Sequence, residues 1–334
     1  MEADFGMRVF FRNATDLRVS SVDRNGAAGA AGIQRGWRIT AINGQSITDT
    51  SQSSFIVSNV FNAATTTFSF LLPDNSSRQL TLNRRSFVND PLLADSVYQL
   101  GGNRVGYFVL NSFLGDTNQV RQNMDRVFGR FENAGVNELV VDLRYNGGGF
   151  VMLAAYLLNY LAPSGVNGQT MFTNQFNDQY TRFNSTTTFA KKGNLRLNRV
   201  FFIVSRQTAS ASEIVINSIR PFLDVKLVGP AATTGKPVGF YEIPVGNWFI
   251  FPVSFRTVNR NGDANYFNGM APDYIAADGL DRNWGDAQEE CLSRTLRFIN
   301  TGSWGRMAPF DEQLLQHQLR IQVANNNLGM PLFK

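Results

Sequence analysis

The first 88 residues contain short apolar or alternating runs separated by Gly and Asn turns. Runs of this length and pattern are typical of half-buried strands. They predict strands at residues 7–11, 17–22, 37–42, 65–72 and 78–82. The third run closes at Asn43-Gly44, a strong turn motif, and residues 73–77 predict a hairpin loop. Residues 51–62 predict a helix that begins after Asp49 or Thr50.

The pattern changes around residues 89–91, where strand and helix patterns begin to alternate. Apolar residues at helical spacing predict a helix over 116–133, and the apolar run 137–143 is typical of a buried parallel strand. Residues 164–198 have weak periodicity and are interpreted as an excursion from the core. The remaining predicted elements are strands at 104–110, 199–205 and within 244–257, and helices at 150–161, 212–222 and 286–299.

This alternation predicts an α/β core after a β-rich N-terminal domain, a mixed α/β chain as a whole. We place the first domain at residues 1–88, the second at 89–305 and a C-terminal extension at 306–334.

Composition is globular, with 43% hydrophobic and 17% charged residues, and the net charge is +5. Basic residues are scattered, with no run longer than the pairs Arg84-Arg85 and Lys191-Lys192, so no nucleic-acid partner is predicted. No run of 18 apolar residues is present, so no membrane span is predicted. The first residues do not form a signal peptide, and the leader of an exported protein would be missing from this chain.

The chain has one cysteine and one histidine, Cys291 and His317. A disulfide within the chain and a zinc site built on several thiolates are therefore excluded, and Cys291 is predicted to lie in the core. A Ser-His-Asp triad would have to use His317, in a polar C-terminal stretch, and we do not favour it. No metal and no organic cofactor is predicted.

Residues 142–149, Asp-Leu-Arg-Tyr-Asn-Gly-Gly-Gly, lead from a buried strand into a helix. Such a loop presents backbone N–H groups that can bind a phosphate or the oxyanion of an acyl-transfer intermediate. A Walker-type phosphate loop would need Lys-Ser or Lys-Thr after the glycines, whereas Phe150-Val151 follow, so that function is excluded. A plain strand-to-helix turn remains an equal alternative.

Two further segments contain groups suited to acyl transfer. Ser210, in Thr-Ala-Ser-Ala-Ser-Glu at 208–213, lies in a strand-to-helix turn where a nucleophile benefits from the helix dipole. Lys236, in Thr-Gly-Lys-Pro-Val-Gly at 234–239, could be partly buried, and burial lowers a lysine pKa enough to make it a base. In isolation, Ser212 heading the helix as an ordinary cap and a surface turn lysine are the simpler interpretations.

Together, from about residue 89 to 300, these segments resemble the tail-specific, C-terminal processing serine peptidases. The resemblance rests on four ordered motifs, at 142–149, 208–213, 235–236 and 269–273 (Gly-Met-Ala-Pro-Asp). It implies a crotonase-like α/β core with Ser210 as nucleophile and Lys236 as base. It also implies that Gly148 or Gly149, with Ala211, binds the oxyanion.

The family also has a PDZ domain before the core, and residues 1–88 resemble one, especially over 28–47. The resemblance implies that the loop Phe5-Gly6-Met7 grips a peptide carboxylate through backbone N–H groups. The strand that follows, with Val9, would pair with the peptide by β-augmentation. A β-rich domain that only packs on the core is the alternative.

Two positions depart from the family pattern. Phe240 stands four residues after Lys236, where members often have a glutamine thought to orient the lysine, and Gly147 replaces a common proline.

As a whole, the resemblance implies a serine endopeptidase that cleaves proteins or peptides with free C-termini, exported to the bacterial periplasm or cell envelope. Alternatives are a non-catalytic peptide-binding protein, favoured by Phe240, and an acyl-CoA-type enzyme. The sequence predicts no oligomeric state.

Overall fold

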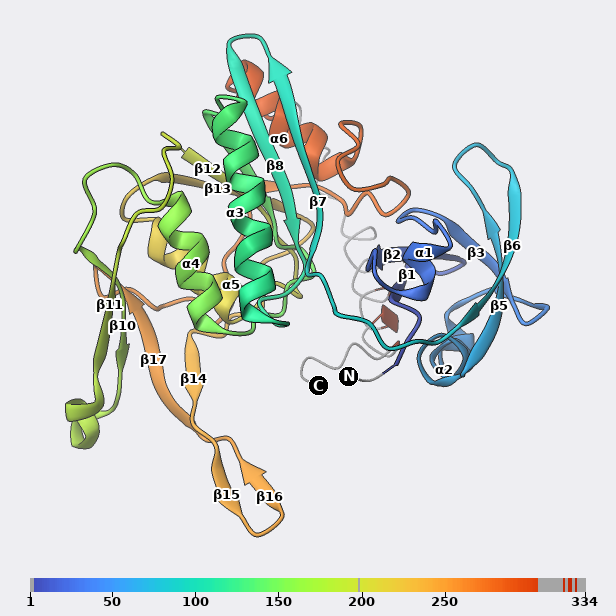
Figure 1. Ribbon diagram of the computed structural model, residues 1–334, viewed down its shortest axis with the longest axis horizontal. Helices are drawn as coiled ribbons and strands as arrows, with labels where there is room; N and C mark the ends of the chain where they lie inside the picture. Colours follow the sequence, from blue (N-terminus) through green and yellow to red (C-terminus); the bar gives the residue numbers. More distant parts are fainter. Residues whose placement is uncertain (1–2, 198, 306–320, 322–323, 326–327, 329–334) are drawn as a thin grey trace. The chain divides into compact units, whose positions relative to one another are not determined.

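The computed structural model describes residues 3–197, 199–305, 321, 324, 325 and 328 (Figure 1). The chain divides into two compact units. The first comprises Met1–Leu93, Asp278–Ser293 and Gly305–Lys334, and the second comprises Ala94–Ala277 and Arg294–Trp304. His317 and most of the predicted extension 306–334 lie outside the described residues.

The first unit is built on a sheet with strand order β1-β2-β3-β5-β6, in which β4 pairs with β3. All its pairs are antiparallel, and β1 lies at the end of the sheet. Its strands are β1 (Met7–Asn13), β2 (Asp16–Val22), β3 (Arg38–Ile42), β4 (Gln45–Ser46), β5 (Thr65–Leu71) and β6 (Ser77–Asn83). The predicted strands of this region are confirmed.

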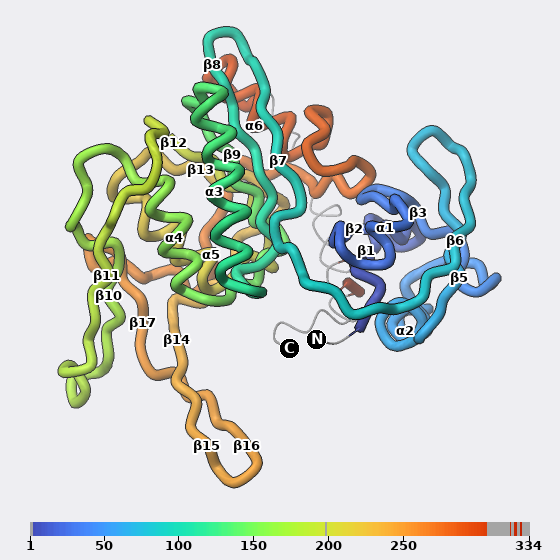
Figure 2. Tube along the Cα trace, in the orientation of Figure 1, coloured from blue at the N-terminus to red at the C-terminus, as the bar shows by residue number. Residues whose placement is uncertain are grey.

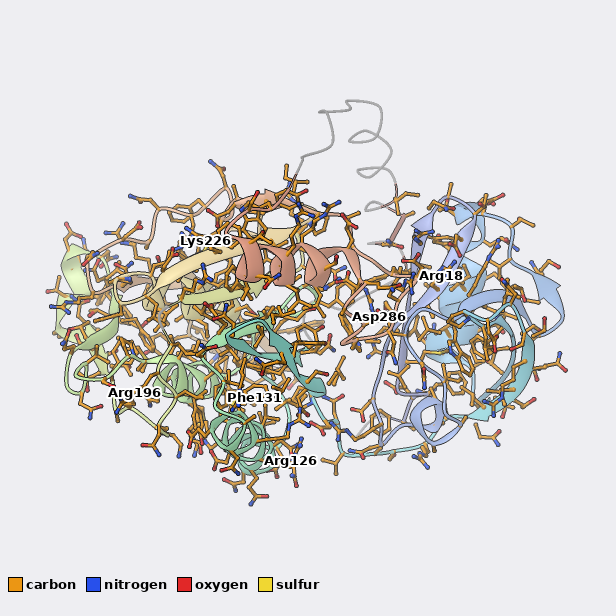
Figure 3. All side chains as sticks on the ribbon, turned by 90° about the horizontal axis from the view of Figure 1, so that it is seen from above. Arg18, Arg126, Phe131, Arg196, Lys226 and Asp286 are labelled. Atoms are coloured by element: carbon orange, nitrogen blue, oxygen red, sulfur yellow. The ribbon has the colours of Figure 1, made fainter. Side chains whose placement is uncertain are left out.

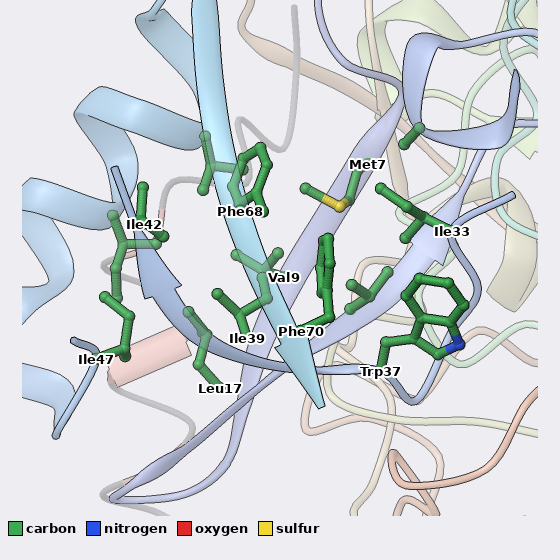
Figure 4. Close-up of a cluster of buried hydrophobic side chains, with 14 of the residues drawn as sticks. Met7, Val9, Leu17, Ile33, Trp37, Ile39, Ile42, Ile47, Phe68 and Phe70 are labelled. Carbon is green, nitrogen blue, oxygen red and sulfur yellow. The ribbon is translucent and has the colours of Figure 1, made fainter. Parts of the chain in front are cut away.

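Helical segments complete the first unit: α1 (Ala27–Ala30), η1 (Thr50–Gln52), α2 (Ser53–Val57) and η2 (Ser58–Asn62). The last three confirm the predicted helical stretch, and Asp49 caps it, since its side chain accepts a hydrogen bond from the Ser51 N–H. The sheet encloses an apolar core that includes Met7, Val9 and Phe68 (Figure 4).

The second unit has a central sheet with strand order β18-β13-β12-β9-β8-β7. From β8 to β18 every pair is parallel, as the alternating pattern predicted. The strands are β7 (Leu92–Leu100), β8 (Asn103–Leu110), β9 (Glu138–Asp142), β12 (Arg199–Ile203), β13 (Asp224–Gly229) and β18 (Tyr274–Ile275).

The main helices of this unit follow its strands, as the tube in Figure 2 traces. They are α3 (Thr117–Asn133), α4 (Val151–Leu161), α5 (Ala211–Ile219) and α6 (Glu290–Thr301), of which the part from Arg294 onward belongs to this unit. On α3, Phe131 is buried whereas Arg126 points outward (Figure 3). Cys291 is fully buried, as predicted. No helix among the described residues is long and apolar enough to cross a membrane.

Some predicted boundaries were wrong. The last helix begins at Glu290 rather than 286, because the Glu289 carboxylate caps it by accepting the Leu292 N–H at 2.9 Å. Helix α5 begins at Ala211, so Ser210 rather than Ser212 is its N-cap residue, and it ends at Ile219.

Residues 164–198 contain more regular structure than predicted: β10 (Thr170–Gln175), η3 (Asp178–Phe183) and β11 (Ser185–Thr188). They join a second sheet of this unit with strand order β11-β10-β17-β14, where β14 is Val238–Phe240 and β17 is Val253–Asn259. Between β14 and β17 the chain forms a two-stranded hairpin, β15 (Ile243–Val245) with β16 (Trp248–Ile250). The strands predicted within 244–257 are thus confirmed.

Candidate active site

Ser210 lies in the turn between β12 and α5 with an unusual backbone conformation, φ 56° and ψ −115°. A non-glycine residue in such a region costs about 1–3 kcal/mol and persists only when its surroundings impose it. The turn is fastened to the preceding segments, because Thr208 Oγ1 donates to Leu143 O at 2.8 Å and the Ala209 N–H donates to Asn146 O at 3.1 Å. The strain is thus imposed by buried hydrogen bonds.

Asn146, fully buried, links the glycine turn to the Ser210 turn. Its carbonyl also accepts a hydrogen bond from Ser212 Oγ at 3.0 Å, and its Nδ2 donates to Leu110 O at the end of β8 at 2.9 Å. Its Oδ1 accepts the Gly148 N–H at 2.9 Å. One asparagine therefore fixes three backbone segments around the serine.

Gly148 packs directly against the Ser210 turn. A Cβ at Gly148 would lie 2.8 Å from Ser210 Cβ and 3.0 Å from the Ala211 nitrogen, and the residue has φ 102°. Only glycine fits both the space and the dihedral angle. The motif at 142–149 is therefore adjacent to the motif at 208–213 in space.

The backbone N–H groups near Ser210 differ in their partners. That of Gly148 donates to Asn146, whereas those of Gly149 and Ala211 have no hydrogen-bond partner among the described residues. The Phe113 N–H donates to Gly148 O, and Phe113 O accepts the Phe150 N–H. In this parallel pairing the N–H of the residue between them, Gly149, points away from Phe113. Ala211 is the first residue of α5, where an N–H group has no intrahelical acceptor.

The Glu213 carboxylate joins the Ser210 turn to the Lys236 turn. Glu213 is fully buried. Its Oε2 accepts hydrogen bonds from the backbone N–H groups of Ser210 and Lys236, each at 2.9 Å. Oε1 accepts Thr233 Oγ1 at 2.6 Å and the Gly235 N–H at 2.7 Å. Four donors satisfy the charge, which is the condition for burying a carboxylate without large cost.

Lys236 is partly buried, and this burial lowers the pKa of its ammonium below the ordinary value, while the nearby Glu213 charge opposes the shift. Its Nζ lies 4.5 Å from the centroid of the Phe240 ring. An ammonium group over an aromatic face is attracted to the ring. The Phe240 ring thus contacts the end of the lysine side chain.

The Lys236 turn is braced from the other side by residues 269–273. The Thr233 N–H donates to Met270 O, and the Met270 N–H donates to Thr233 Oγ1. A Cβ at Gly269 would lie 2.1 Å from Thr233 O, so the two segments approach closely. Asp273 Oδ2 accepts the Leu227 N–H at 2.7 Å, which fastens the motif to β13. In addition, the Thr234 N–H donates to Thr208 O at 2.9 Å. All four sequence motifs therefore meet around one site.

A buried ion pair supports the start of the glycine turn. Arg144 Nε and Nη2 bond to the two oxygens of Asp142 at 3.0 and 2.8 Å, and Tyr107 Oη donates to Asp142 at 3.0 Å. The bidentate geometry fixes the residues just before the glycines.

Sequence reasoning assigned no role to Glu213, Asn146 or Phe240. Glu213 and Asn146 are polar residues directly after buried strands or inside the quoted motifs, which is the feature that could have identified them. Their partners, however, lie far along the chain. From the sequence, Phe240 is only a residue that replaces the glutamine common in the family. The spacing does not reveal that its ring reaches the Lys236 amine.

In the first unit, the side chains of Phe5, Met7 and Val9 are core residues, each at most 2% exposed. Gly6 has φ 70°, and its N–H donates to the Asp4 carboxylate. A carboxylate of the chain itself thus occupies one N–H group of the loop predicted to bind a peptide terminus.

Of the described residues in the C-terminal region of the same unit, Asn325 contacts the outer edge of β1. Asn325 Oδ1 accepts the Phe11 N–H at 2.7 Å and its Nδ2 donates to Phe11 O at 3.0 Å. Ile321 and Leu328 are buried in the apolar core of this unit. The side chain of Asn325 thus bonds to β1 much as a neighbouring strand would.

No group of three or more His, Cys, Asp or Glu side chains suited to hold a metal ion is present in the described part of the chain.

Comparison with known proteins places both units. The family model described as peptidase family S41 matches residues 104–276, more than half of the chain, and a PDZ domain model matches residues 18–66. A curated relative, carboxyl-terminal-processing peptidase 1, chloroplastic, of Arabidopsis thaliana, is 26% identical over 269 residues, which cover 77% of this chain and 52% of the relative. The chain thus spans about half the length of that relative.

Among solved structures, one of Bacteroides fragilis described as an S41 protease is similar, with a TM-score of 0.77 and 25% identity. The match covers 90% of this chain and 84% of the other. The expected family and the mixed α/β fold, a PDZ domain with a protease core, are confirmed. The chain therefore belongs to peptidase family S41.

Proposed function

We propose that this protein is a serine endopeptidase that cleaves other proteins near their C-termini, with Ser210 as nucleophile and Lys236 as base. The observation that most supports this is the Glu213 carboxylate, which accepts the N–H groups of both residues. Acyl transfer needs a nucleophile beside a base, and the buried carboxylate holds the backbone of the serine close to that of the lysine.

The first step is proton transfer from the Ser210 hydroxyl to the neutral amine of Lys236. Burial favours the neutral amine by lowering the lysine pKa. The serine oxygen then forms a bond to the peptide carbonyl carbon, and the carbonyl oxygen takes the negative charge. Lys236 returns the proton to the leaving amine as the C–N bond breaks, and water hydrolyses the acyl-enzyme by the same route.

We assign the oxyanion site to the N–H groups of Ala211 and Gly149. Neither has a partner among the described residues, whereas the Gly148 N–H already donates to Asn146. The N-terminus of α5 adds a favourable partial positive charge. Gly148 then serves by its small size, which allows the two turns to approach.

We assign to Phe240 the positioning of the Lys236 side chain. Its ring face favours the ammonium form that exists after the proton has been taken up. The ring therefore stabilises the transient charge, while burial acts in the opposite direction by lowering the lysine pKa.

Substrate recognition is proposed for the PDZ domain. Strand β1 lies at the end of its sheet, so an extended peptide can add to it by β-augmentation, with its terminal carboxylate at the Phe5-Gly6-Met7 loop. The peptide would replace Asp4 at the Gly6 N–H and Asn325 at Phe11. Location in the bacterial periplasm or cell envelope is part of the same proposal.

The test is reaction with a serine-directed fluorophosphonate, followed by mass spectrometry of the labelled peptide. Label on Ser210 is expected in the parent protein and in Ser212→Ala, at a buried serine of α5, but not in Ser210→Ala. A folded parent protein that takes no label on Ser210 would contradict the proposal. It would instead favour the non-catalytic peptide-binding protein, or the acyl-CoA-type enzyme if a CoA thioester binds.

A further inference from the structure

The hairpin between β14 and β17 is apolar and exposed along its whole length. Every residue from 240 to 253 is exposed, and all are apolar except Glu242, Gly246 and Asn247. Trp248 is 79% exposed, and the aromatic residues Phe249 and Phe251 are 57% and 58% exposed. Figure 1 shows this hairpin extending beyond the sheet that contains β14 and β17.

Both faces of the hairpin are apolar. The register pairs Val245 with Trp248 and Ile243 with Ile250, and since directly opposed residues share a face, these four side chains lie on one side. The pair Pro244 and Phe249 lies on the other side. A ribbon that packs on a single surface would have one polar face.

The base of the hairpin is anchored, so the apolar tip is presented in a defined direction. The Tyr241 ring stacks on Phe176, with centroids 5.9 Å apart, and contacts Phe255 at 5.6 Å. The Tyr241 N–H also donates to Ser254 Oγ at 3.1 Å. The exposed hairpin is therefore held at its base by an aromatic cluster that includes Tyr241.

The exposed apolar area of the hairpin is large enough to indicate an interaction site. At roughly 150–250 Å² for each aromatic side chain, the rings of 241, 248, 249 and 251 alone expose on the order of 500 Å². This equals the largest apolar patch of a typical monomer, and such patches are interaction sites.

We propose that this hairpin inserts into the interfacial region of a lipid bilayer. A bilayer surrounds an inserted ribbon and covers both of its faces, whereas a second copy or a protein partner seated on one face leaves the other exposed. A peptide added to its edge would cover neither face. Tryptophan and phenylalanine at the tip are the residues that membrane interfaces favour.

Charge and size fit the same occupant. The only charged side chain between residues 240 and 253 is Glu242 at the base, so no charge has to enter the bilayer. The chain as a whole has a net charge of +5, which complements the anionic surface of membranes. Strands of three residues span about 10 Å, which matches the depth of interfacial insertion.

The test is flotation of the full chain with phosphatidylcholine vesicles, with and without phosphatidylglycerol, at low and high salt. Binding to both vesicle types that persists at high salt is expected, with a blue shift of tryptophan emission that disappears in Trp248→Ser. The variants Trp248→Ser and Phe249→Ser alter opposite faces, and each should weaken binding about tenfold. Ile275→Ser, at a residue 63% exposed on β18, is the matched control and should bind like the parent.

Four results would overturn the proposal. They are absence of flotation, flotation that needs anionic lipid and ignores the hairpin variants, sensitivity of only one face, and self-association that the hairpin variants abolish. The last would assign the hairpin to contacts with a second copy. Lipid binding is measured without any substrate, so its failure is independent of the proposed peptidase activity.

Discussion

The Ser210–Lys236 site and the β1 edge of the PDZ domain use different parts of the polypeptide. At the first, the proposed chemistry belongs to side chains, and a buried carboxylate with four donors fixes two turns. At the second, the side chains of Phe5, Met7 and Val9 are buried in the core, so the proposed peptide contacts fall to backbone groups.

This difference determines how each site responds to mutation. A site made of side chains can be removed by single substitutions without unfolding the protein. A site made of backbone groups is changed only through its competitors, which here are Asp4 and Asn325. The following experiments separate the two sites, in order of decreasing effect.

Lys236→Ala removes the proposed base and should lower kcat by about 10³-fold or more, because general base catalysis is lost. Folding should be retained, since the backbone N–H that bonds to Glu213 remains. Kinetics with an unfolded protein substrate, together with thermal unfolding, measures both effects. Lys191→Ala is the matched control, because burial also lowers the pKa of that lysine, whose Nζ lies by Tyr160 O instead. Full activity in Lys236→Ala would refute the role of the lysine.

Glu213→Gln should lower both stability and activity, because a side-chain amide accepts through one oxygen only and turns its NH₂ towards donors. We expect a loss of about 2–4 kcal/mol in the free energy of unfolding and a fall in kcat of about 10²-fold. Denaturant unfolding and kinetics on the folded fraction measure these changes.

Glu289→Gln provides the comparison for that variant. Glu289 is also a buried carboxylate that accepts backbone N–H groups, from Gly279 and Leu292, but in the first unit. It should lose stability and keep the kcat of the folded protein. Equal kcat losses in the two variants would show that Glu213 acts only through folding.

Phe240→Leu should shift the pH profile. Activity needs the neutral amine, so kcat/KM rises with pH as Lys236 loses its proton, and burial places this rise below the ordinary lysine pKa of 10.5. Removing the ring removes an interaction that favours the ammonium, so the rising limb should move to lower pH by about half a unit. Loss of positioning should lower kcat several-fold. An unchanged limb would leave the ring without a role at the amine.

Asn325→Ala should strengthen peptide binding at β1 by about fivefold, because it removes two hydrogen bonds that compete for Phe11. Calorimetric titration with a peptide that ends in apolar residues measures the affinity. The catalytic rate on a short peptide substrate should stay the same. Weaker binding in the variant would mean that Asn325 supports the edge instead of covering it.

The elements of both units could be predicted where burial follows a simple period. Helix α3 buries Val120, Met124 and Phe128 at the expected spacing, and β9 is buried throughout. Strands β10 and β11 were not predicted, because β11 (Ser-Thr-Thr-Thr) has no apolar residue and the two apolar residues of β10, Met171 and Phe172, are adjacent and so do not alternate. Strand β7 was not predicted either, because Leu92 is the one buried residue of the strand and no alternating apolar face results.

The residues proposed for catalysis can be chosen from the sequence, whereas their contacts cannot. The motifs identified Ser210 and Lys236 because their neighbours in sequence are distinctive. The role of Glu213 depends on Thr233 and Gly235, about twenty residues away, and that of Asn146 on Leu110 and Ser212. Such pairings exist only in the folded chain, so local patterns do not specify them.

The most direct test of the central claim is cleavage of an unstructured protein with an apolar C-terminus by the parent chain, Ser210→Ala and Ser212→Ala. We predict that the parent and Ser212→Ala release C-terminal fragments and that Ser210→Ala, equally folded, releases none. Cleavage that persists in Ser210→Ala would contradict the assignment of the nucleophile.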